Sequence, residues 1–219
     1  MKFLIGDTID LCAPQDSDFE IWASWFNDSK ITSFLEQGIF PNSINDQKFF
    51  YKQAISEGRF IAMVKAKDGN LLGVTSISEI NFQKKSCQIS NVTPIKSKDA
   101  VLAPLEARAL IVKHAFETMG MERVWASNCF PGLIQWVLKY QTLGFKVEGF
   151  TFEGFRKGEF TSDTIRLSIL KSDYDKLKSY RGGSLWMGTE KMLQLVKKSR
   201  KQEKKLVQLH KSIKDFSLL

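Results

Sequence analysis

A long β-hairpin in the middle of the chain is the feature that most restricts the possible folds. Residues 60–66 and 72–82 are rich in apolar and β-branched side chains, and the turn Asp68-Gly69-Asn70 separates them. This pattern is a strong signal for two antiparallel strands. Residues 87–95 read as a third strand after a short polar turn. A sheet centred on these strands is therefore expected, and the remaining segments have to pack against it.

Helical and extended segments alternate on both sides of these strands. Residues 104–119 give the clearest helix, because Pro104 lies in its first turn and Gly120 just past its end. The full expected order is a strand at 8–13, a helix at 16–26, a helical turn at 31–35, a helix at 43–56, the three strands, a helix at 104–119, a strand at 123–127, a helix at 133–143, strands at 145–155 and 160–170, and a closing helix at 172–180. The order predicts one α/β (α+β) domain over residues 1–180, with a mixed, mostly antiparallel sheet flanked by helices.

The helix expected at residues 43–56 has a recognisable beginning and a predicted buried side. Ser43 is a candidate N-cap, since its hydroxyl can accept a hydrogen bond from a backbone N–H of the first turn. Phe50, Ala54 and Ile55 are the side chains expected to be buried. This helix is therefore predicted to pack against the sheet.

Positive charge is concentrated at the C-terminal end of the chain. Residues 181–219 contain ten Lys/Arg and three Asp/Glu, a net of +7, while the whole chain carries +8. Residues 181–183 read as a linker, and residues 189–216 as one long helix with an interrupted apolar stripe. A basic helical C-terminal extension at 181–219 is therefore predicted, with a homo-oligomer through this helix as one use. Nucleic acid is not expected as a partner, because most basic runs are solvated helix faces.

The cysteine, histidine and hydropathy patterns exclude several classes of protein. Cys12, Cys87 and Cys129 are odd in number and widely spaced, which argues against a disulfide framework. Neither His114 nor His210 has a Cys or a second His nearby, so no metal is expected, and His114 is predicted to pack inside a helix. No apolar run approaches the roughly 20 residues of a membrane span, and the N-terminus is unlike a secretory signal. A cytoplasmic location without a membrane span is expected.

Three motifs in a fixed order resemble one enzyme family. Residues 140–149 read Y-x-x-x-G-F-x-x-E-G, residues 155–160 with Asp163 read as a final hairpin, and residues 22–28 read W-x-x-W-x-N-D. Together they resemble the GNAT acetyltransferases, in particular the branch of ribosomal-protein N-acetyltransferases and bacterial amino-sugar N-acetyltransferases. The resemblance covers residues 8–174. It implies the GNAT fold, in which the central strands splay apart around acetyl-CoA.

The resemblance implies that acetyl-CoA is the acetyl donor and that no metal takes part. The pantetheine arm is expected along residues 87–95. The diphosphate is expected at the N-terminus of the next helix, where free N–H groups and the helix dipole favour an anion. The residues that would bind the cofactor are Ile89, Asn91, Val92, Lys98, Ala100, Val101, Leu102, Ala103, Leu105 and Asn128.

The resemblance also suggests which side chains transfer protons and contact the acceptor. Tyr140 is the candidate acid that protonates the leaving CoA sulfur, with core packing as the alternative. Glu79 is the candidate base, directly or through water, with a solvent-facing carboxylate as the alternative. Asn27, Asp28 and Gln88 are the candidate acceptor-binding residues, although Asn-Asp is equally ordinary helix-terminating chemistry.

The expected diphosphate loop departs from the family pattern. Where relatives have Q/R-x-x-G-x-G/A, residues 99–104 begin with Asp99 and contain neither glycine. Pro104 has no N–H to offer a phosphate, and Asp99 adds a negative charge. Lys96 and Lys98 are the cations expected to compensate. The loop is therefore the part of the predicted site that differs most from the family.

These observations predict an N-acetyltransferase that moves an acetyl group from acetyl-CoA to a primary amine. The expected acceptor is an amino sugar, with the nucleotide-linked form used in surface glycan synthesis as the favoured case. A protein N-terminus or a polyamine is the enzymatic alternative, and the atypical loop supports a third interpretation, a GNAT-fold binding or scaffold protein without catalysis. The aromatic side chains expected to line an acceptor pocket are Phe34, Phe40, Trp136, Phe150, Phe152 and Phe155.

Overall fold

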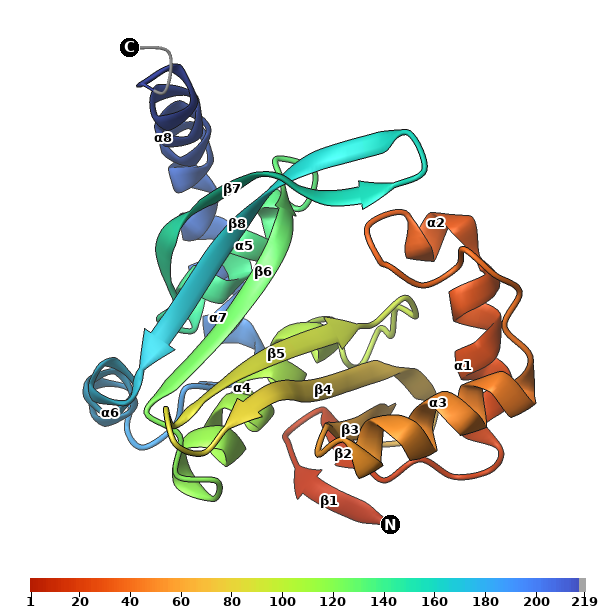
Figure 1. Cartoon of the computed structure of the whole chain (residues 1–219). Helices are drawn as coiled ribbons and strands as arrows, with labels where there is room; N and C mark the ends of the chain where they lie inside the picture. The colour runs from red at the N-terminus through yellow and green to blue at the C-terminus, as the bar shows by residue number, and fades with distance from the viewer. Residues whose placement is uncertain (217–219) are drawn as a thin grey trace. The chain divides into compact units, whose positions relative to one another are not determined.

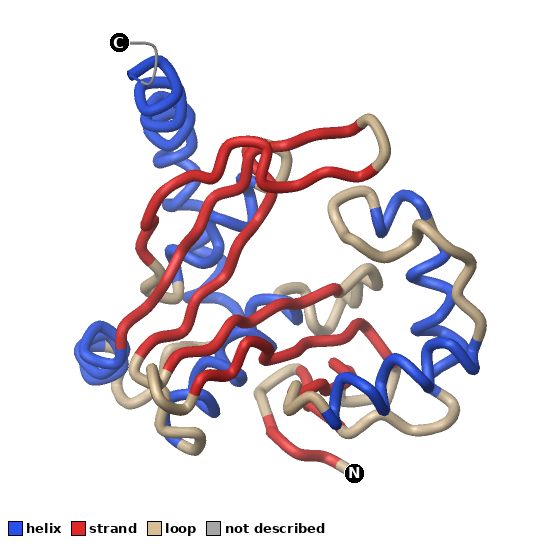
Figure 2. The backbone as a smooth tube through the Cα atoms, in the orientation of Figure 1, coloured by secondary structure: helices blue, strands red, loops and turns tan. Residues whose placement is uncertain are grey.

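The computed structural model describes residues 1–216 of the chain. The chain divides into two compact units, Met1–Val124 and Trp125–Leu219. Figure 1 labels the elements of both units, and Figure 2 shows how strands, helices and loops alternate along the backbone. The boundary falls near the start of strand β6 (Arg123–Phe130). The predicted boundary between a domain at residues 1–180 and an extension at residues 181–219 stays a prediction.

An antiparallel sheet forms the centre of the first unit. Each strand pairs with the next one along the chain, in the order β1-β2-β3-β4-β5. These strands are β1 (Lys2–Ile5), β2 (Ile9–Cys12), β3 (Phe60–Ala66), β4 (Leu71–Asn81) and β5 (Ser86–Val92). The predicted hairpin and third strand are confirmed, although β5 ends at Val92 and not at Ile95. Strand β1 was not predicted.

Helices cover both faces of this sheet. They are α1 (Asp18–Asn27), α2 (Ser29–Thr32), α3 (Ile44–Ser56) and α4 (Ala103–Glu117). On one face, α1 and α3 bury aromatic side chains such as Trp22 against Ile61 and Met63 of β3, and each such burial stabilises by roughly 1.5–3 kcal/mol. Alternate strand residues point to opposite faces, so the buried Ala62 and Val64 face the other side, where α4 packs against β2 to β5.

Helix α3 begins as the sequence predicts. The Ser43 hydroxyl accepts the N–H of Asp46 at 3.2 Å, and the Asp46 carboxylate accepts the N–H of Ser43 at 2.9 Å, which forms a capping box. Ala54 is buried and Phe50 is partly buried, as predicted. The prediction for Ile55 is wrong, because this side chain is 44% exposed. It follows Ala54 by one residue, which turns it about 100° further round the helix.

The turn between β1 and β2 is fixed by a carboxylate from α4. The N–H groups of Asp7 and Thr8 and the Thr8 hydroxyl all donate to the buried side chain of Glu106. Burial raises the pKa of Glu106, and these hydrogen bonds oppose that shift. A Cβ at Gly6 would collide with the same carboxylate. Only a glycine at this position therefore lets the turn approach α4.

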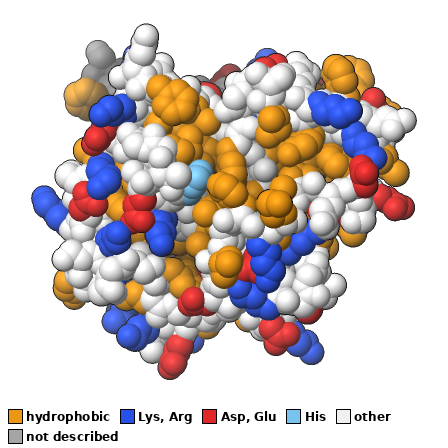
Figure 3. All heavy atoms as spheres, turned by 90° about the horizontal axis from the view of Figure 1, so that it is seen from below, with side chains coloured by type: hydrophobic (Ala, Val, Ile, Leu, Met, Phe, Trp, Pro, Cys, Tyr) orange, Lys and Arg blue, Asp and Glu red, His pale blue; other side chains and the backbone are white. Residues whose placement is uncertain are grey.

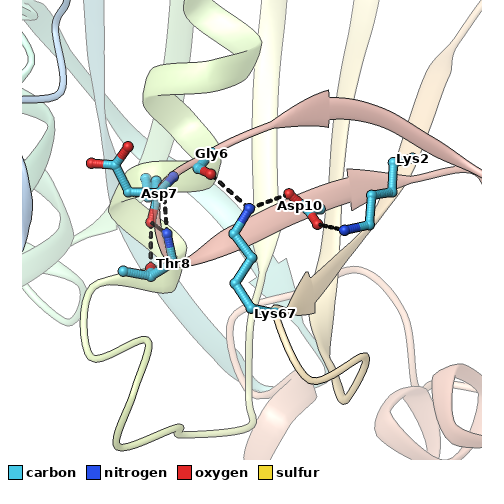
Figure 4. A network of polar contacts seen from close by, with 7 residues as sticks. Lys2, Gly6, Asp7, Thr8, Asp10 and Lys67 are labelled. Carbon is cyan, nitrogen blue, oxygen red and sulfur yellow. Dashed lines mark hydrogen bonds and ion pairs between the residues drawn. The ribbon is translucent and has the colours of Figure 1, made fainter.

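A second carboxylate holds the neighbouring edge of the sheet. Figure 4 shows Asp10 between Lys2 and Lys67, whose ammonium groups lie 2.6 and 2.5 Å from its oxygens. Lys67 also donates to the carbonyl of Gly6 at 2.7 Å. Burial acts to raise the pKa of Asp10, but the two lysines outweigh it and lower the pKa. The N-terminal hairpin is thus tied by ionic contacts to the β3–β4 turn.

The β7–β8 hairpin is the centre of the second unit. Strand β8 pairs antiparallel with β7 and lies between β6 and β7. The pairing continues to Lys157 and Phe160, so the turn is only Gly158-Glu159, shorter than predicted. The remaining elements are β7 (Lys146–Lys157), β8 (Phe160–Leu170), α5 (Ile134–Thr142), α6 (Lys171–Tyr180), α7 (Thr189–Ser199) and α8 (Glu203–Phe216).

The C-terminal extension packs onto this second unit. Helix α7 packs against α5, and Gln135 donates to Glu203 at 2.9 Å. The prediction of one long helix is wrong, because a 3-10 turn at Arg200–Gln202 separates α7 from α8. Leu206 is buried, whereas Phe216 is 76% exposed, so the apolar stripe is only partly covered. Self-association through this helix stays a prediction.

The surface mixes apolar and charged side chains. Figure 3 shows apolar side chains exposed in several places on one face, with acidic and basic side chains around them. His114 packs against the rings of Phe3 and Phe60, at 5.1 and 5.6 Å between ring centroids, as predicted. Burial lowers the pKa of His114. No helix within residues 1–216 has the length and hydropathy to cross a membrane. That same range holds no cluster of His, Cys, Asp and Glu able to bind a metal.

Candidate functional site

Strand β5 divides its side chains between the two faces of the first unit's sheet. Ile89 is buried on the α4 face. Ser90 lies opposite Ser76 in the ladder, and Ser76 lies opposite Ile61. Because Ile61 contacts α1 and α3, Gln88 and Ser90 also point to that face. The predicted acceptor residue Gln88 therefore lies on the face that α1 and α3 cover.

A glycine holds the end of β5 close to β4. A Cβ at Gly73 would lie 2.6 Å from Cα of Thr93 and closer still to the carbonyl oxygen of Val92. The N–H of Ile95 also donates to the carbonyl of Leu72 at 3.3 Å. The chain therefore leaves β5 at a fixed place, which sets where the loop to α4 begins.

We expect Gly73→Ala to destabilise the protein by about 1–3 kcal/mol, because the added methyl group pushes the end of β5 away from β4. Urea unfolding measures this loss. Gly149→Ala is the matched control, since a Cβ there meets nothing within 4 Å, and its effect should stay within about 0.5 kcal/mol. Equal losses in the two variants would contradict the close approach at Gly73.

The loop between β5 and α4 adopts ordinary backbone conformations. Leu102, which precedes α4, has φ −107°, and no residue from 93 to 105 has a positive φ. The backbone of this loop therefore requires no glycine. Ala100 is buried, whereas Lys98 and Val101 are exposed.

The N–H groups at the start of α4 are mostly in use. Those of Ala103 and Leu105 donate to carbonyls three residues earlier, at 2.9 and 2.8 Å, and Pro104 has none. The N–H groups of Val101 and Leu102 form no hydrogen bond within residues 1–216. The donors left for an anion thus lie just before the helix. The helix itself begins at Ala103, one residue earlier than predicted.

Charge around this loop is mixed. Lys96, Lys98 and Asp99 are all exposed. The carboxylate of Glu106 is buried and already occupied by the β1–β2 turn. Two exposed cations against one exposed acid leave the loop weakly positive, which favours an anionic ligand.

Asn91 carries an unsatisfied polar group on β5. Its Oδ1 accepts a hydrogen bond from the Thr93 hydroxyl. Its Nδ2 is buried and has no hydrogen-bond partner within residues 1–216. A buried donor without an acceptor costs about 1–3 kcal/mol. This amide is therefore available to a ligand that lies along the strand.

Asn27 and Asp28 both have structural partners. The side-chain amide of Asn27 donates to the carbonyl of Asn42 at 2.7 Å and accepts its N–H at 2.8 Å. Asp28 caps α2 by accepting the N–H of Lys30 at 2.8 Å. Helix-terminating chemistry therefore accounts for Asp28, and a loop contact accounts for Asn27. Contact with an acceptor stays a prediction for both.

Glu79 lies at the far end of the β4–β5 hairpin from the loop. It is exposed, has φ +48°, and falls in a bulge between Ser78 and Asn81. A bulge re-aims the side chains next to it. Ser78 Oγ and Gln88 Oε1 lie 3.5 Å apart on the neighbouring pair. The exposure of Glu79 fits the solvent-facing alternative, and its role as a base stays a prediction.

A row of polar groups that the sequence analysis missed lies on the same face as Gln88. Arg59 Nη2 donates to Ser76 Oγ at 3.0 Å, and Ser76 Oγ lies 2.7 Å from Ser90 Oγ. The guanidinium also lies over the ring of Phe50, 5.9 Å from its centroid. No local sequence signal marks this row, because Ser76 and Ser90 lie on different strands and only their pairing brings them together.

Tyr140 and Asn128 belong to the second unit. Tyr140 on α5 is 2% exposed, and its ring meets that of Phe145 edge-on at 4.9 Å. Asn128 lies inside β6 and not after it, which corrects the predicted strand end. Its Nδ2 is buried without a hydrogen-bond partner in the described part of the chain. Burial raises the pKa of the Cys129 thiol, which disfavours the thiolate form that a nucleophilic cysteine needs.

Solved structures of acetyltransferases resemble this chain. A spermidine N-acetyltransferase from Vibrio cholerae in complex with CoA and spermine has a TM-score of 0.68 and 20% identity, over 77% of this chain and 99% of its own. An acetyltransferase of the GNAT family from Bacillus anthracis has a TM-score of 0.64 and 17% identity, over 78% and 99%. No protein-family model matches the sequence, and no curated protein matches it. At these identities the likeness establishes the fold, and the chain has the fold of the GNAT acetyltransferases.

Proposed function

We propose that this protein is an N-acetyltransferase that moves the acetyl group of acetyl-CoA to a primary amine. The observation that carries the proposal is the pair of N–H groups at Val101 and Leu102, which have no partner in the described chain. Adjacent free amides just before a helix suit the diphosphate of CoA. The unsatisfied amide of Asn91 suits a carbonyl of the pantetheine arm. The GNAT fold supports the same assignment.

Most of the other proposed cofactor contacts come from the same strand, the loop and the first turn of α4. Lys98 would place a cation near the diphosphate, and small side chains at 100 and 103 would allow the backbone to approach it. The remaining residues proposed to contact acetyl-CoA are Ile89, Val92, Ala100, Ala103, Leu105 and Asn128.

In the proposed reaction, the neutral amine attacks the carbonyl carbon of the thioester. A C–N bond forms, the C–S bond breaks, and the CoA thiolate leaves. Tyr140 gives its phenolic proton to the thiolate, and the amine gives its proton to Glu79 directly or through water. Asn27, Asp28 and Gln88 are proposed to contact the acceptor.

We propose an amino sugar, free or linked to a nucleotide, as the acceptor. The motif resemblance to amino-sugar N-acetyltransferases supports this choice. Phe40 supports it as well, because it is 81% exposed and offers a face for stacking. The relative from Vibrio cholerae was solved with spermine, which makes a polyamine the second candidate. A protein N-terminus is the third.

Calorimetric titration with acetyl-CoA tests the proposal. Acetyl-CoA should bind much more tightly than acetyl-pantetheine, because the shorter thioester lacks the diphosphate that the loop amides would hold. No heat with acetyl-CoA would contradict the proposal and favour a GNAT-fold binding protein without catalysis.

We expect Asp99→Asn to tighten acetyl-CoA binding by about threefold at low salt, because it removes an exposed negative charge beside the proposed diphosphate site. The gain should shrink as salt is added. Glu20→Gln is the control, since Glu20 is an exposed acid on α1. The same change in affinity in both variants would mean that Asp99 is not near the phosphates.

A further inference from the structure

The guanidinium of Arg59 has no ionic partner among residues 1–216. It is half-buried where α3 leads into β3, and in the part of the chain that the structure describes it donates one hydrogen bond, from Nη2 to Ser76. The acids that act on it, Glu36 and Glu57, are exposed and lie beyond ion-pair distance. Its Nε is buried and donates to nothing in the described chain. A partly buried cation without a partner is costly, which marks this place as one prepared for an anion.

Hydrogen-bonded hydroxyl groups connect Arg59 to the strand that carries the proposed acceptor residue Gln88. The hydroxyls of Ser76 and Ser90 continue its hydrogen-bonded row across β4 to β5. Ser90 follows Gln88 by two residues, so both side chains lie on the same face of β5. The charge of Arg59 therefore lies on the same face of the sheet as the proposed acceptor residue Gln88.

We propose that Arg59 binds an anionic group of the acceptor, so that the substrate is an amine that also carries a carboxylate or a phosphate. The inference rests on the proposed acetyl transfer and narrows its substrate class. The planar guanidinium presents N–H groups in a fork that fits two oxygens of either anion. A polyamine would instead bring further ammonium groups toward this cation, which Coulomb repulsion disfavours.

A purely structural role leaves part of the geometry unexplained. The contact with the Phe50 ring and the hydrogen bond to Ser76 use one face and one N–H of the guanidinium. The Nε donor remains buried without a partner in the described residues. The substitution used as a test has to separate these roles, so the packing of the side-chain stem should be kept. Arg59→Met keeps that stem, and Arg59→Lys keeps the charge without the fork.

The experiment compares acetyl transfer to four amines. Glucosamine has no anionic group, glucosamine 6-phosphate adds a phosphate, muramic acid adds a carboxylate, and spermidine adds cations. The wild type should prefer one of the two anionic amines over glucosamine by about tenfold or more in kcat/KM. The preferred one identifies the anion.

Arg59→Met should abolish the preference for the anionic amine, mainly by raising its KM, and should leave kcat/KM for glucosamine within about twofold of the wild type. Arg59→Lys should keep part of the preference. Lys52→Met, an exposed lysine on α3, is the control and should keep the preference.

The outcomes separate this inference from the proposed function. If acetyl-CoA gives no heat with the wild type, the proposed function fails. If acetyl-CoA binds but spermidine is preferred, or if Arg59→Met weakens all amines equally, only the anion site is overturned. If no amine is acetylated, calorimetry with CoA present replaces the kinetics, using glucosamine 6-phosphate, muramic acid and glucosamine. Equal binding of these three, or binding unaffected by Arg59→Met, then overturns the inference.

Discussion

Tyr140→Phe is expected to lower kcat for acetyl transfer by about 100-fold or more, with little change in the Kd of acetyl-CoA. The ring of Tyr140 is 2% exposed and packs edge-on against Phe145, so phenylalanine preserves the packing and removes the hydroxyl. In the proposed mechanism, loss of this hydroxyl makes the CoA sulfur leave as a free thiolate, which slows the breaking of the C–S bond. Steady-state kinetics and acetyl-CoA titration on one preparation measure the two effects separately.

Tyr174→Phe is the matched control for this prediction. Tyr174 is also buried, at 1% exposure, and lies on α6 of the same unit. It has no part in the proposed chemistry, so its kcat should stay within about twofold of the wild type. An unchanged kcat in Tyr140→Phe, or the same loss in both variants, would remove the acid role from Tyr140.

Asp163→Ala is expected to reduce the free energy of unfolding by about 2–4 kcal/mol. Asp163 accepts the N–H of Glu153 at 2.8 Å, and its other oxygen lies 2.7 Å from His210 Nε2 and 3.0 Å from Lys214 Nζ. Alanine leaves a backbone donor and an imidazole without their acceptor and loosens α8 from the β7–β8 hairpin. Urea unfolding measures the loss, and limited proteolysis of the C-terminal extension reports the release of α8.

The same carboxylate gives this stability a pH dependence. Burial acts to raise the pKa of Asp163, but the N–H of Glu153 and the contacts with Lys214 and His210 outweigh it, so the pKa is lowered from 3.8. A lowered carboxyl pKa stabilises the native state above the unfolded-state value, and this contribution is lost as the pH falls through the native pKa. The wild type should therefore lose stability below about pH 4 more steeply than Asp163→Ala.

A less buried carboxylate provides the control for Asp163. Asp173 pairs with Lys146 at 2.8 Å, and its side chain is 23% exposed. Asp173→Asn should cost no more than about 1 kcal/mol at neutral pH. The interpretation of Asp163 as an anchor is contradicted if both variants lose equal stability, or if Asp163→Ala has the same pH profile as the wild type.

The parts of the fold that could be predicted are those with local signals. The hairpin of β3 and β4 is marked by its turn Asp68-Gly69-Asn70, and α3 by the Ser43 cap. Strand β1 could not be predicted, because it is four residues long and its turn is held by Glu106, far away in the sequence. The break at Arg200–Gln202 contains neither Gly nor Pro. The break separates α7, which packs on α5, from α8, whose His210 contacts Asp163. Tertiary contacts therefore account for the break, and local sequence does not reveal it.

The sequence assigns the proposed site residues to particular elements, and their roles stay predictions. The order of the motifs assigned most of the proposed cofactor residues to β5, the loop before α4 and the first turn of α4. Which N–H groups remain free there depends on the turn that precedes Ala103, and composition cannot reveal that. Arg59 could not be found from the sequence, because its importance comes from the pairing of Ser76 with Ser90 across two strands. It also depends on the lack of a partner for its Nε in the described chain.

The paired contacts between Asn27 and Asn42 have a consequence for how acceptor choice can change during evolution. They tie together both ends of the segment that contains α2. Ile31 and Leu35 of this segment pack against the core, but exposed positions such as Phe40 can vary without moving the sheet. Loops closed in this way tolerate insertion at a small entropic cost. Changes in the proposed acceptor preference should therefore accumulate at these exposed positions, while Arg59, which precedes β3, and Ser76 and Ser90 on β4 and β5 remain in place.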